Sequence, residues 1–383
     1  MDKKIKVAVL GCGNRGCGVV WDLLRDSNRN VEVVAAYDPN RAAFDRCTGS
    51  DHSWQWHAPN CKCCSSYQEA INTPGVEWVM VFSPNAFHKE QVVAAFEAGK
   101  NVFSEKPLAT TIEDCQAMNE AHKKAGTIFA TGFVLRYSKL YEKAKEILDS
   151  GVLGKLYAIN ADENITPEHG GYIMCNWRRL TKFAGPHILE KCCHDLDLIN
   201  WFCGSLPSKV ASFSTKSIFL PENDFLMTKY DRKIFRAEWN DLVALDDPFT
   251  SDKDLKDNTV SIAKFRNDIM VSFQCSMSNI IPERRMVFCC TEGTMKLDLY
   301  NSELIYRKLG EDYVHNFVFG VDGHGGGDNY IMKALYDTMC NGGTPKCSGT
   351  EGLASAVYAL AIDKASTEGK IIDLEPIWEK LGK

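Results

Sequence analysis

Apolar runs and helical patterns alternate along the first third of the chain. Five short runs rich in valine, isoleucine and phenylalanine are each followed by a stretch with helical periodicity. Helices of about a dozen residues between buried strands predict a parallel, doubly wound sheet, whose ligands bind at the carboxyl ends of the strands. The predicted strands lie within residues 5–10, 31–38, 76–88, 101–107 and 127–137.

A different pattern follows this first part of the chain. Short runs of β-branched and aromatic residues, separated by turn residues, predict an antiparallel sheet. Few helices accompany these runs, so one sheet face needs another cover, and we expect a homo-oligomer contact there. An acidic, irregular insertion falls at about residues 219 to 257. The predicted strands are 156–164, 209–217, 258–265, 268–276, 284–290, 294–300 and 303–308.

One predicted helix, over residues 185–205, interrupts these strands. Glu190, His194 and Asp197 are spaced at i, i+4 and i+7, so in a single helix they share a polar face. A histidine one turn beyond a carboxylate can be oriented and tuned by it, which is what an acid/base group needs. His194 is therefore a candidate general base, and Glu190 its partner.

A glycine pattern follows the first predicted strand. Gly11-x-Gly13-x-x-Gly16 lies between a strand and a helix, as in dinucleotide-binding loops, where the glycines allow a tight turn and a close approach to pyrophosphate. Asp38 ends the next strand about 22 residues later, where an acid accepts hydrogen bonds from ribose hydroxyls and favours NAD over NADP. The other loop residues predicted to bind the cofactor are Cys12, Asn14 and Arg15.

Polar residues also occupy the carboxyl ends of the later parallel strands. We expect them at the rim of the sheet, where the nicotinamide ring would lie. Lys106 lies between Glu105 and Pro107, and the proline restrains the backbone beside it. The residues predicted to bind the cofactor here are Ser83, Asn85, His88, Glu105 and Lys106.

Length and composition set limits on the possible functions. The 383 residues favour two domains, an N-terminal one over 1–133 and a C-terminal one over 134–383. Hydrophobic residues make up 45% and charged residues 25%, which is typical of a soluble globular protein. A net charge of −6 gives no reason to expect nucleic acid, and no apolar run is long enough for a membrane helix.

The sixteen cysteines have two possible interpretations. The run Cys61–Cys64, with Cys47 and His57 nearby, has residue types that bind zinc, but it lacks a pair of CxxC motifs. Without a secretion signal, reduced thiols in a cytoplasmic protein are the better interpretation, and no metal is expected.

The sequence resembles the glucose–fructose oxidoreductase, inositol dehydrogenase and MocA family. The resemblance rests on the glycine loop and on the motifs EAGKNVFSEKPLATTIEDC, GFVLRYSKLYEKAKEILDSGVLGKL, HDLDLINWFCG and HGGGDNYIMKALYD. It implies an N-terminal Rossmann domain, a C-terminal open-faced β-sheet domain, bound NAD(P), and a sugar or cyclitol substrate. It also implies a catalytic lysine at Lys106, a cis peptide before Pro107 and a catalytic histidine at His194. Glu190 stands where the family usually has aspartate, and Lys191 lies in KCCH instead of LGSH.

These features predict an NAD-dependent oxidation of a secondary hydroxyl of a sugar, glycoside or cyclitol. Lys106 would stabilise charge on the substrate oxygen, His194 would take the proton, and Glu190 would hold its tautomer. CNWRRL, residues 175–180, fits a packed loop equally well, and GHGGGD, residues 323–328, fits a hinge with an N-capping aspartate. The candidate substrate-binding residues are Arg136, Asn176, Trp177, Arg178, His187, Lys191, His324 and Asp328.

The same residues are compatible with two other functions. Some members of the family oxidise a glycoside transiently and cleave it by elimination, with no net use of NAD. A sugar-sensing protein without turnover is the other alternative, although the presence of Lys106 and His194 argues against it. The expected partners are a small carbohydrate or cyclitol and a second copy of the chain, as a dimer or tetramer. Neither nucleic acid nor a membrane is expected.

Overall fold

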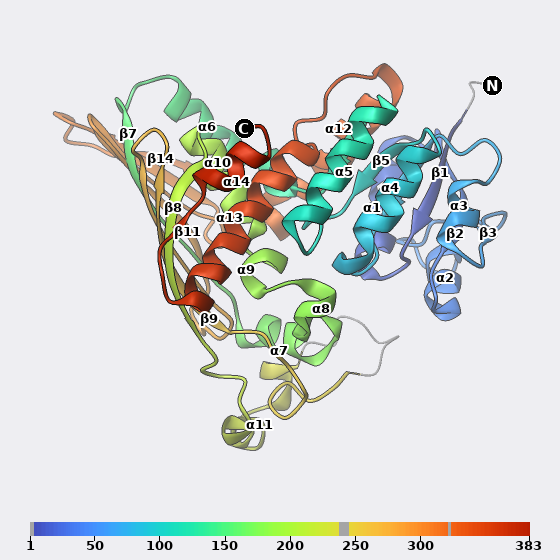
Figure 1. The fold of residues 1–383 in the computed structure, drawn as a ribbon, viewed down its shortest axis with the longest axis horizontal. Helices are drawn as coiled ribbons and strands as arrows, with labels where there is room; N and C mark the ends of the chain where they lie inside the picture. Colours follow the sequence, from blue (N-terminus) through green and yellow to red (C-terminus); the bar gives the residue numbers. More distant parts are fainter. Residues whose placement is uncertain (1–3, 237–244, 321–322) are drawn as a thin grey trace. The chain divides into compact units, whose positions relative to one another are not determined.

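The structure is a computed structural model that describes residues 4–236, 245–320 and 323–383, and it divides into two compact units (Figure 1). Unit 1 contains residues 4–133 and also Asp328–Leu353. The rest of the described chain forms unit 2. The predicted C-terminal domain, 134–383, therefore differs from unit 2, because one late helix packs with the N-terminal sheet unit. No helix within the described ranges is both long and apolar enough to cross a membrane.

A six-stranded sheet forms the centre of unit 1. Every strand pair in it is parallel, and the order is β3-β2-β1-β4-β5-β6, the order of a doubly wound dinucleotide-binding fold. This confirms the fold predicted for the N-terminal half. The strands are β1 (Ile5–Leu10), β2 (Val31–Tyr37), β3 (Lys62–Cys63), β4 (Trp78–Val81), β5 (Asn101–Ser104) and β6 (Phe129–Thr131).

The edge strand β3 was not predicted. It lies in the cysteine run that was interpreted as a thiol-rich loop, where Lys62 and Cys63 pair with Ala35 and Ala36 of β2. Two residues are too few for an alternating pattern to be recognised.

Helices connect the strands of unit 1 as the sequence indicates. In α5, for example, the Thr111 hydroxyl accepts a hydrogen bond from Asp114 N, and Gly126 ends the helix at a positive φ of 65°. The helical segments of unit 1 are α1 (Asn14–Asp26), α2 (Arg41–Thr48), α3 (Tyr67–Ile71), η1 (Asn85–Phe87), α4 (His88–Glu97), α5 (Ile112–Ala125) and nearly all of α12 (Gly327–Asn341).

A nine-stranded sheet forms the centre of unit 2, in the order β14-β13-β12-β11-β7-β10-β9-β8-β15. The antiparallel prediction needs one correction, because β7 and β10 pair in parallel, so the sheet is mixed. Two short strands, β14 and β15, were not predicted. The strands are β7 (Leu156–Asn164), β8 (Pro207–Thr215), β9 (Asn258–Phe265), β10 (Met270–Ser276), β11 (Glu283–Cys290), β12 (Gly293–Asp298), β13 (Glu303–Lys308), β14 (His315–Val318) and β15 (Ile372–Asp373).

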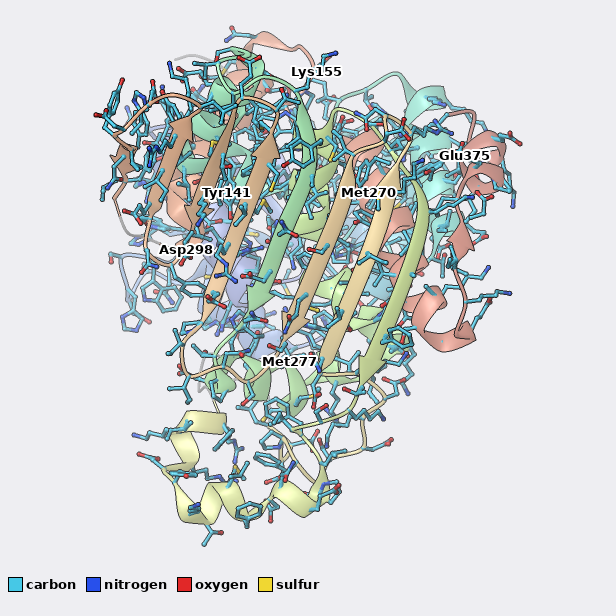
Figure 2. All side chains as sticks on the ribbon, turned by 90° about the vertical axis from the view of Figure 1, so that its left-hand side faces the viewer. Tyr141, Lys155, Met270, Met277, Asp298 and Glu375 are labelled. Carbon is cyan, nitrogen blue, oxygen red and sulfur yellow. The ribbon has the colours of Figure 1, made fainter. Side chains whose placement is uncertain are left out.

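The two faces of this sheet differ in what covers them. Helices α6 (Lys139–Asp149), α10 (Cys193–Cys203) and α13 (Gly349–Glu368) lie on one side (Figure 1), and the other face is open (Figure 2). In β9 the side chains alternate strictly, with Val260 and Ile262 exposed and Ala263 buried. The remaining helical segments of unit 2 are η2 (Val134–Tyr137), α7 (Pro167–Cys175), η3 (Trp177–Arg179), α8 (Thr181–Ala184), α9 (His187–Glu190), η4 (Pro221–Asn223), α11 (Phe225–Lys229), η5 (Arg232–Phe235), η6 (Gly323–Gly326) and α14 (Glu375–Lys380).

The helix predicted over residues 185–205 is broken into α9 and α10. The helix hydrogen bonds of α9 end at Lys191 N, and those of α10 begin at the carbonyl of Cys192, which accepts from the N–H groups of Asp195 and Leu196. No proline or glycine marks this break, and the apolar periodicity continues across it, so nothing in the sequence indicated the break. The shared helix face of Glu190, His194 and Asp197 was therefore a wrong prediction.

The insertion predicted as irregular has a small core of its own. Phe219, Phe235 and Phe249 are buried against residues of α7. The insertion and α7 approach each other so closely that a Cβ on Gly171 would overlap the carbonyl of Phe235. Residues 237–244 of the insertion lie outside the described residues.

Candidate active site

The glycine loop of unit 1 has the geometry that its pattern predicts. Gly11 has a positive φ of 94°, and a Cβ there would lie 2.7 Å from the backbone of Phe82 and Ser83. A Cβ on Gly16 would overlap the carbonyl oxygen of Gly11. At Gly13, by contrast, a Cβ would meet no described atom within 4 Å. The first and third glycines therefore serve packing, and the open side at Gly13 suits the approach of a phosphate.

Asp38 follows β2 and is tied to this loop. Its Oδ2 accepts a hydrogen bond of 2.7 Å from Cys12 N, and its Oδ1 accepts one of 2.8 Å from Asn40 N. A carboxylate has about four acceptor positions, so both oxygens keep capacity for ribose hydroxyls. Arg41, the nearest basic neighbour in sequence, forms an ion pair with Asp45 at 2.8 Å.

Arg15 links the glycine loop to the loop that carries Glu105 and Lys106. Its Nε is 2.7 Å from Glu105 Oε1, and its Nη1 is 2.6 Å from Asp328 Oδ1. Burial lowers the pKa of Arg15, but the two carboxylates outweigh it, so the pKa is raised and the residue stays charged. Asp328 follows the first residue of α12, Gly327, so it lies inside the helix and is not the N-cap residue that the sequence predicted. Its carboxylate pairs with Arg15 instead.

The loop around Lys106 is held from two sides. The Lys106–Pro107 peptide is cis, as the family resemblance implied, and Lys106 is half-buried. The Lys106 N–H donates to Glu105 Oε2 at 3.0 Å. His88 lies with Nδ1 2.9 Å from the carbonyl of Pro107 and Nε2 2.8 Å from the carbonyl of Ser83. His88 therefore joins the loop after β5 to the loop after β4.

This arrangement gives His88 a positioning role. The side chain is 1% exposed, and burial lowers its pKa. Ser83 is also held in place, because its hydroxyl donates to Gln91 Oε1 at 2.8 Å. Asn85 is buried in η1. Direct contacts of these residues with the cofactor stay predictions.

In unit 2, Glu190 and Arg178 form an ion pair that the sequence did not predict. Arg178 Nε donates to Glu190 Oε1 at 2.9 Å, and Nη1 donates to the hydroxyl of Tyr172 at 3.1 Å. The guanidinium also lies 4.3 Å from the ring centre of Trp177. Asn176 caps η3 by accepting from Arg178 N, so CNWRRL is an organised loop.

His194 lies beside His324, and the two ring centres are 5.9 Å apart. His194 is 3% exposed. His324 has a left-handed backbone with φ 54° and is followed by two glycines, Gly325 and Gly326, that also have positive φ. Such a conformation is uncommon for a residue with a Cβ and is often found at functional sites. The structure thus brings together two of the predicted site residues of unit 2.

Arg136 and Lys191 have buried acidic neighbours. The Nε and Nη2 of Arg136 each donate to one carboxylate oxygen of Asp197 at 2.8 Å, and this bidentate pair is almost fully buried. Lys191 Nζ is 3.5 Å from Glu163 Oε1. These two basic residues are part of the packing of unit 2, and their contacts with a substrate stay predictions.

Sequence reasoning missed several residues of this region. Glu163 is 1% exposed and lies between Lys191 and Arg284, which forms a bidentate pair with Asp195. The alternation of β7 gave a signal, because it places Glu163 on the inward row with Ile159 and Ala161. Tyr172 and His169 of α7 were also missed, and no periodic pattern marked them.

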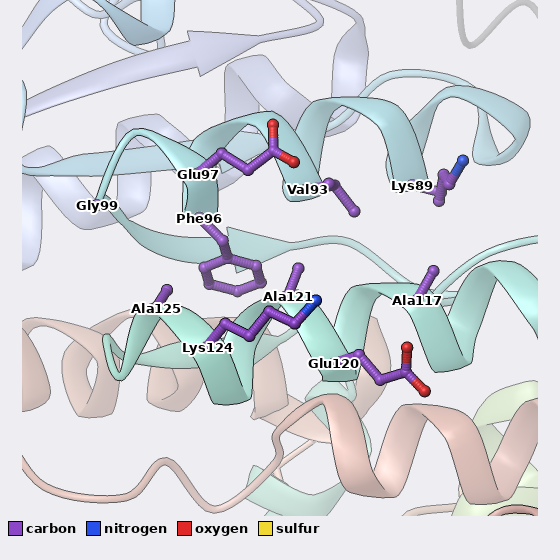
Figure 3. Close-up of a pocket in the computed structure, with 10 residues that line it drawn as sticks. All are labelled: Lys89, Val93, Phe96, Glu97, Gly99, Ala117, Glu120, Ala121, Lys124 and Ala125. Carbon is purple, nitrogen blue, oxygen red and sulfur yellow. The ribbon is translucent and has the colours of Figure 1, made fainter.

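A surface groove of about 540 Å³ in unit 1 is separate from these residues (Figure 3). It lies between α4 and α5. Charged side chains such as Lys89, Glu97 and Glu120 line it around an apolar base that includes Phe96. None of the ten lining residues is a predicted site residue.

Family models match both halves of the chain. Residues 5–133 match the model described as "Oxidoreductase family, NAD-binding Rossmann fold", and residues 141–296 match the "GFO/IDH/MocA C-terminal domain". The chain belongs to the GFO/IDH/MocA oxidoreductase family. The resemblance seen in the sequence is thereby confirmed, and the N-terminal part is an NAD-binding Rossmann domain.

Similar curated proteins carry several names. An inositol 2-dehydrogenase of Salmonella paratyphi B is 30% identical over 230 residues, 58% of this chain and 60% of that protein. An uncharacterized oxidoreductase of Streptococcus pneumoniae is 30% identical over 207 residues, 54% of this chain and 52% of that protein. A 2,7-anhydro-N-acetylneuraminate hydratase of Escherichia coli is 27% identical over 208 residues, 54% and 51% of the two chains. The chain thus matches between half and two thirds of the length of these relatives.

Solved structures show the same fold at low sequence identity. A levoglucosan dehydrogenase in complex with NADH and levoglucosan has a TM-score of 0.79 and 18% identity, covering 97% of this chain and 99% of that chain. A myo-inositol 2-dehydrogenase from Lactobacillus plantarum has a TM-score of 0.71 and 18% identity, with the same coverage.

Proposed function

We propose that the protein is an NAD-dependent dehydrogenase that oxidises a secondary hydroxyl of a sugar, glycoside or cyclitol. The observation that carries the proposal is the connection of Arg15 to Glu105. The glycine loop is the expected binding site of the pyrophosphate. An ion pair of 2.7 Å joins Arg15, in the helix after this loop, to Glu105, the residue before Lys106. Within unit 1, a candidate catalytic lysine is thus built into the cofactor-binding edge of the sheet.

The proposed chemistry assigns one role to each candidate residue. A bound nicotinamide ring supplies the hydride acceptor. The Lys106 ammonium group hydrogen-bonds the substrate oxygen and stabilises the negative charge that develops there. His194 takes the hydroxyl proton as hydride leaves the carbon, so the alcohol becomes a ketone. Glu190 is proposed as a positioning residue for this part of unit 2, through its ion pair with Arg178.

The substrate class is inferred from polar and aromatic groups together with the relatives. The inositol 2-dehydrogenase and the levoglucosan dehydrogenase are named for a cyclitol and a sugar derivative. Trp177 is half-buried and is proposed to stack on a sugar face, and His324 is proposed to hydrogen-bond a hydroxyl next to the reacting one.

A redox-neutral reaction is the second candidate. One relative is named a hydratase, and a hydratase adds or removes water without net oxidation. The same residues would serve a transient oxidation followed by elimination, because the first step also needs hydride and proton removal.

A substrate panel separates these proposals. The purified protein with NAD is incubated with cyclitols, free sugars and glycosides, and NADH absorbance and reaction products are measured in parallel. Net NADH with a ketone product supports the dehydrogenase. Release of an aglycone without NADH supports the second candidate, and binding of both ligands without any product overturns both in favour of a sensing protein. The Lys106→Ala protein is the control for contaminating activities.

We also propose that the open sheet face of unit 2 pairs with a second copy of the chain. Phe213 is 81% exposed and lies opposite Val260 on this face, with Ile262 and Met270 nearby in the register. Apolar patches of this kind usually mark an interface. Replacing Phe213 and Ile262 with glutamate is expected to convert the oligomer to monomer in sedimentation experiments. Phe225→Glu, which alters an exposed residue of α11, is the control.

The compartment is proposed to be the reducing cytoplasm. All sixteen cysteines are free in the structure, and most of them are buried, where a reduced thiol packs as a small apolar side chain.

A further inference from the structure

Three buried side chains of unit 2 converge at the break between α9 and α10. A ligand atom of His187, the Sγ of Cys192 and the Sγ of Cys275 all lie within 4.8 Å of one another. His187 is 4% exposed, and both cysteines are 0% exposed. They come from the first residue of α9, the residue before α10 and the inward row of β10. Three separate segments therefore present soft ligand atoms to one point.

The surroundings of this cluster contain polar atoms that the protein does not satisfy. The Nδ1 of His187 makes no hydrogen bond with any described residue. The carboxylate of Glu163 makes no hydrogen bond of normal geometry with the described residues either, although its Oε1 forms ion pairs of 3.5 Å with Lys191 and Arg284. The carboxylate of Glu163 interacts with the thiol of Cys192 and with the imidazole of His187. A buried polar atom without a partner is costly, so such a group needs an explanation, for example an ion at the site.

We propose that His187, Cys192 and Cys275 bind a zinc ion, with Glu163 beside its fourth coordination position. Two thiolates and one imidazole are a ligand set that zinc prefers, and a carboxylate or a water completes a tetrahedral site. Binding releases the two thiol protons, so the ion with its two thiolates adds no net charge to the buried region. Lys191 and Arg284, each 3.5 Å from Glu163 Oε1, already balance charge in the surrounding network.

The ion would fix the break between the two helices to the sheet. Cys192 is two residues from both Glu190 and His194, so a metal bond at Cys192 would hold the segment that carries both. This positioning effect rests on the proposed function, whereas the metal site itself does not.

Metal content of the purified protein tests the site directly. The full chain is produced in medium containing zinc, purified without chelators under reducing conditions, and analysed by elemental mass spectrometry. We expect about one zinc per chain, and a large loss of zinc in Cys192→Ser and Cys275→Ser. Cys203→Ser, which alters a buried cysteine at the other end of α10, and Cys63→Ser in the cysteine run are expected to keep the metal.

Cobalt substitution keeps the test decisive if the serine variants do not fold. In the unmodified protein, Co²⁺ bound by two thiolates gives an intense thiolate-to-metal absorption band in the near ultraviolet. The proposal is overturned if the unmodified protein holds no stoichiometric zinc and shows no such band after reconstitution with Co²⁺. It is equally overturned if folded Cys192→Ser and Cys275→Ser retain the metal, or if Cys63→Ser loses it. If the protein binds zinc but keeps full activity after a chelator has removed the zinc, only the positioning effect is overturned.

Discussion

Most candidate residues of unit 1 lie in or just after the loops at the carboxyl ends of parallel strands, whereas Arg136, Glu190 and Lys191 of unit 2 belong to ion pairs of largely buried side chains. In unit 1 most of the holding contacts involve the main chain, as with Cys12 N on Asp38 or the two carbonyls around His88. The side chain of Arg15, which joins the two loops, is still 32% exposed. In unit 2 the side chain of Arg284 is 4% exposed and that of Asp195 is 0% exposed.

This difference has an energetic consequence. A loop held by main-chain hydrogen bonds still has free N–H groups, and these groups can bind the phosphates of a ligand. Buried ion pairs, in contrast, contribute little net stability but become very costly when one partner is removed, because the other charge stays buried without compensation. We therefore expect mutations in unit 2 to affect folding first and mutations in unit 1 to affect binding first.

The largest expected effect comes from Arg284. Arg284→Ala leaves Asp195 and Glu163 buried without their main counter-charge, so the free energy of unfolding should fall by about 3–5 kcal/mol. The neighbour Arg285 is a matched control on the same strand, because its side chain is 47% exposed and pairs with Asp162. Arg285→Ala should cost less than about 1 kcal/mol. Urea unfolding followed by circular dichroism measures both, and equal losses would contradict the comparison.

The next largest effect concerns turnover. Lys106→Ala and His194→Ala should each lower kcat by roughly a hundredfold or more, as expected for positioned acid/base groups. NAD affinity should change much less than kcat, because neither residue is needed for the pyrophosphate contacts of the glycine loop. The double variant should lose less than the product of the two single losses if both residues act on one oxygen.

The control for this experiment is Lys124→Ala, an exposed lysine of α5 in the same unit. A Lys106→Ala protein with normal turnover would show that this lysine has a structural role, and the catalytic residues would then have to be sought elsewhere.

What could be read from the sequence follows the same division between the units. The glycine loop, the strand ends and Lys106 were predictable because their geometry depends on residues close in sequence, such as Gly11, Gly13 and Gly16. The ion pair of Arg284 with Asp195 spans 89 residues, and no local pattern marks either partner. The proposed zinc ligands Cys192 and Cys275 are likewise far apart in sequence, so no local spacing marks them.

Two errors show where local patterns fail. The apolar spacing of residues 185–205 continues through the break at Lys191 and Cys192, so periodicity alone predicted one helix. Asp197, which was predicted to share a polar helix face with Glu190 and His194, instead pairs with Arg136, 61 residues earlier in the chain. In both cases tertiary contacts decided the outcome, and the sequence was informative only about the residue types involved.

The smallest expected effect concerns the cofactor and refines the view of unit 1. Asp38→Ala removes the acceptor for the ribose hydroxyls and also the acceptor for Cys12 N. The hydrogen bonds of a charged group contribute about 1.5–3 kcal/mol, so NAD(H) affinity should fall by roughly ten- to a hundredfold. NADP(H) affinity should fall less, because the lost carboxylate no longer repels a 2′-phosphate. Fluorescence titration with both nucleotides measures the ratio, and Asp26→Ala, at the far end of α1, is the control. Equal weakening of both nucleotides would mean that Asp38 acts only by holding the loop, and tighter NADP(H) binding by the unmodified protein would contradict the assignment of its ribose contact.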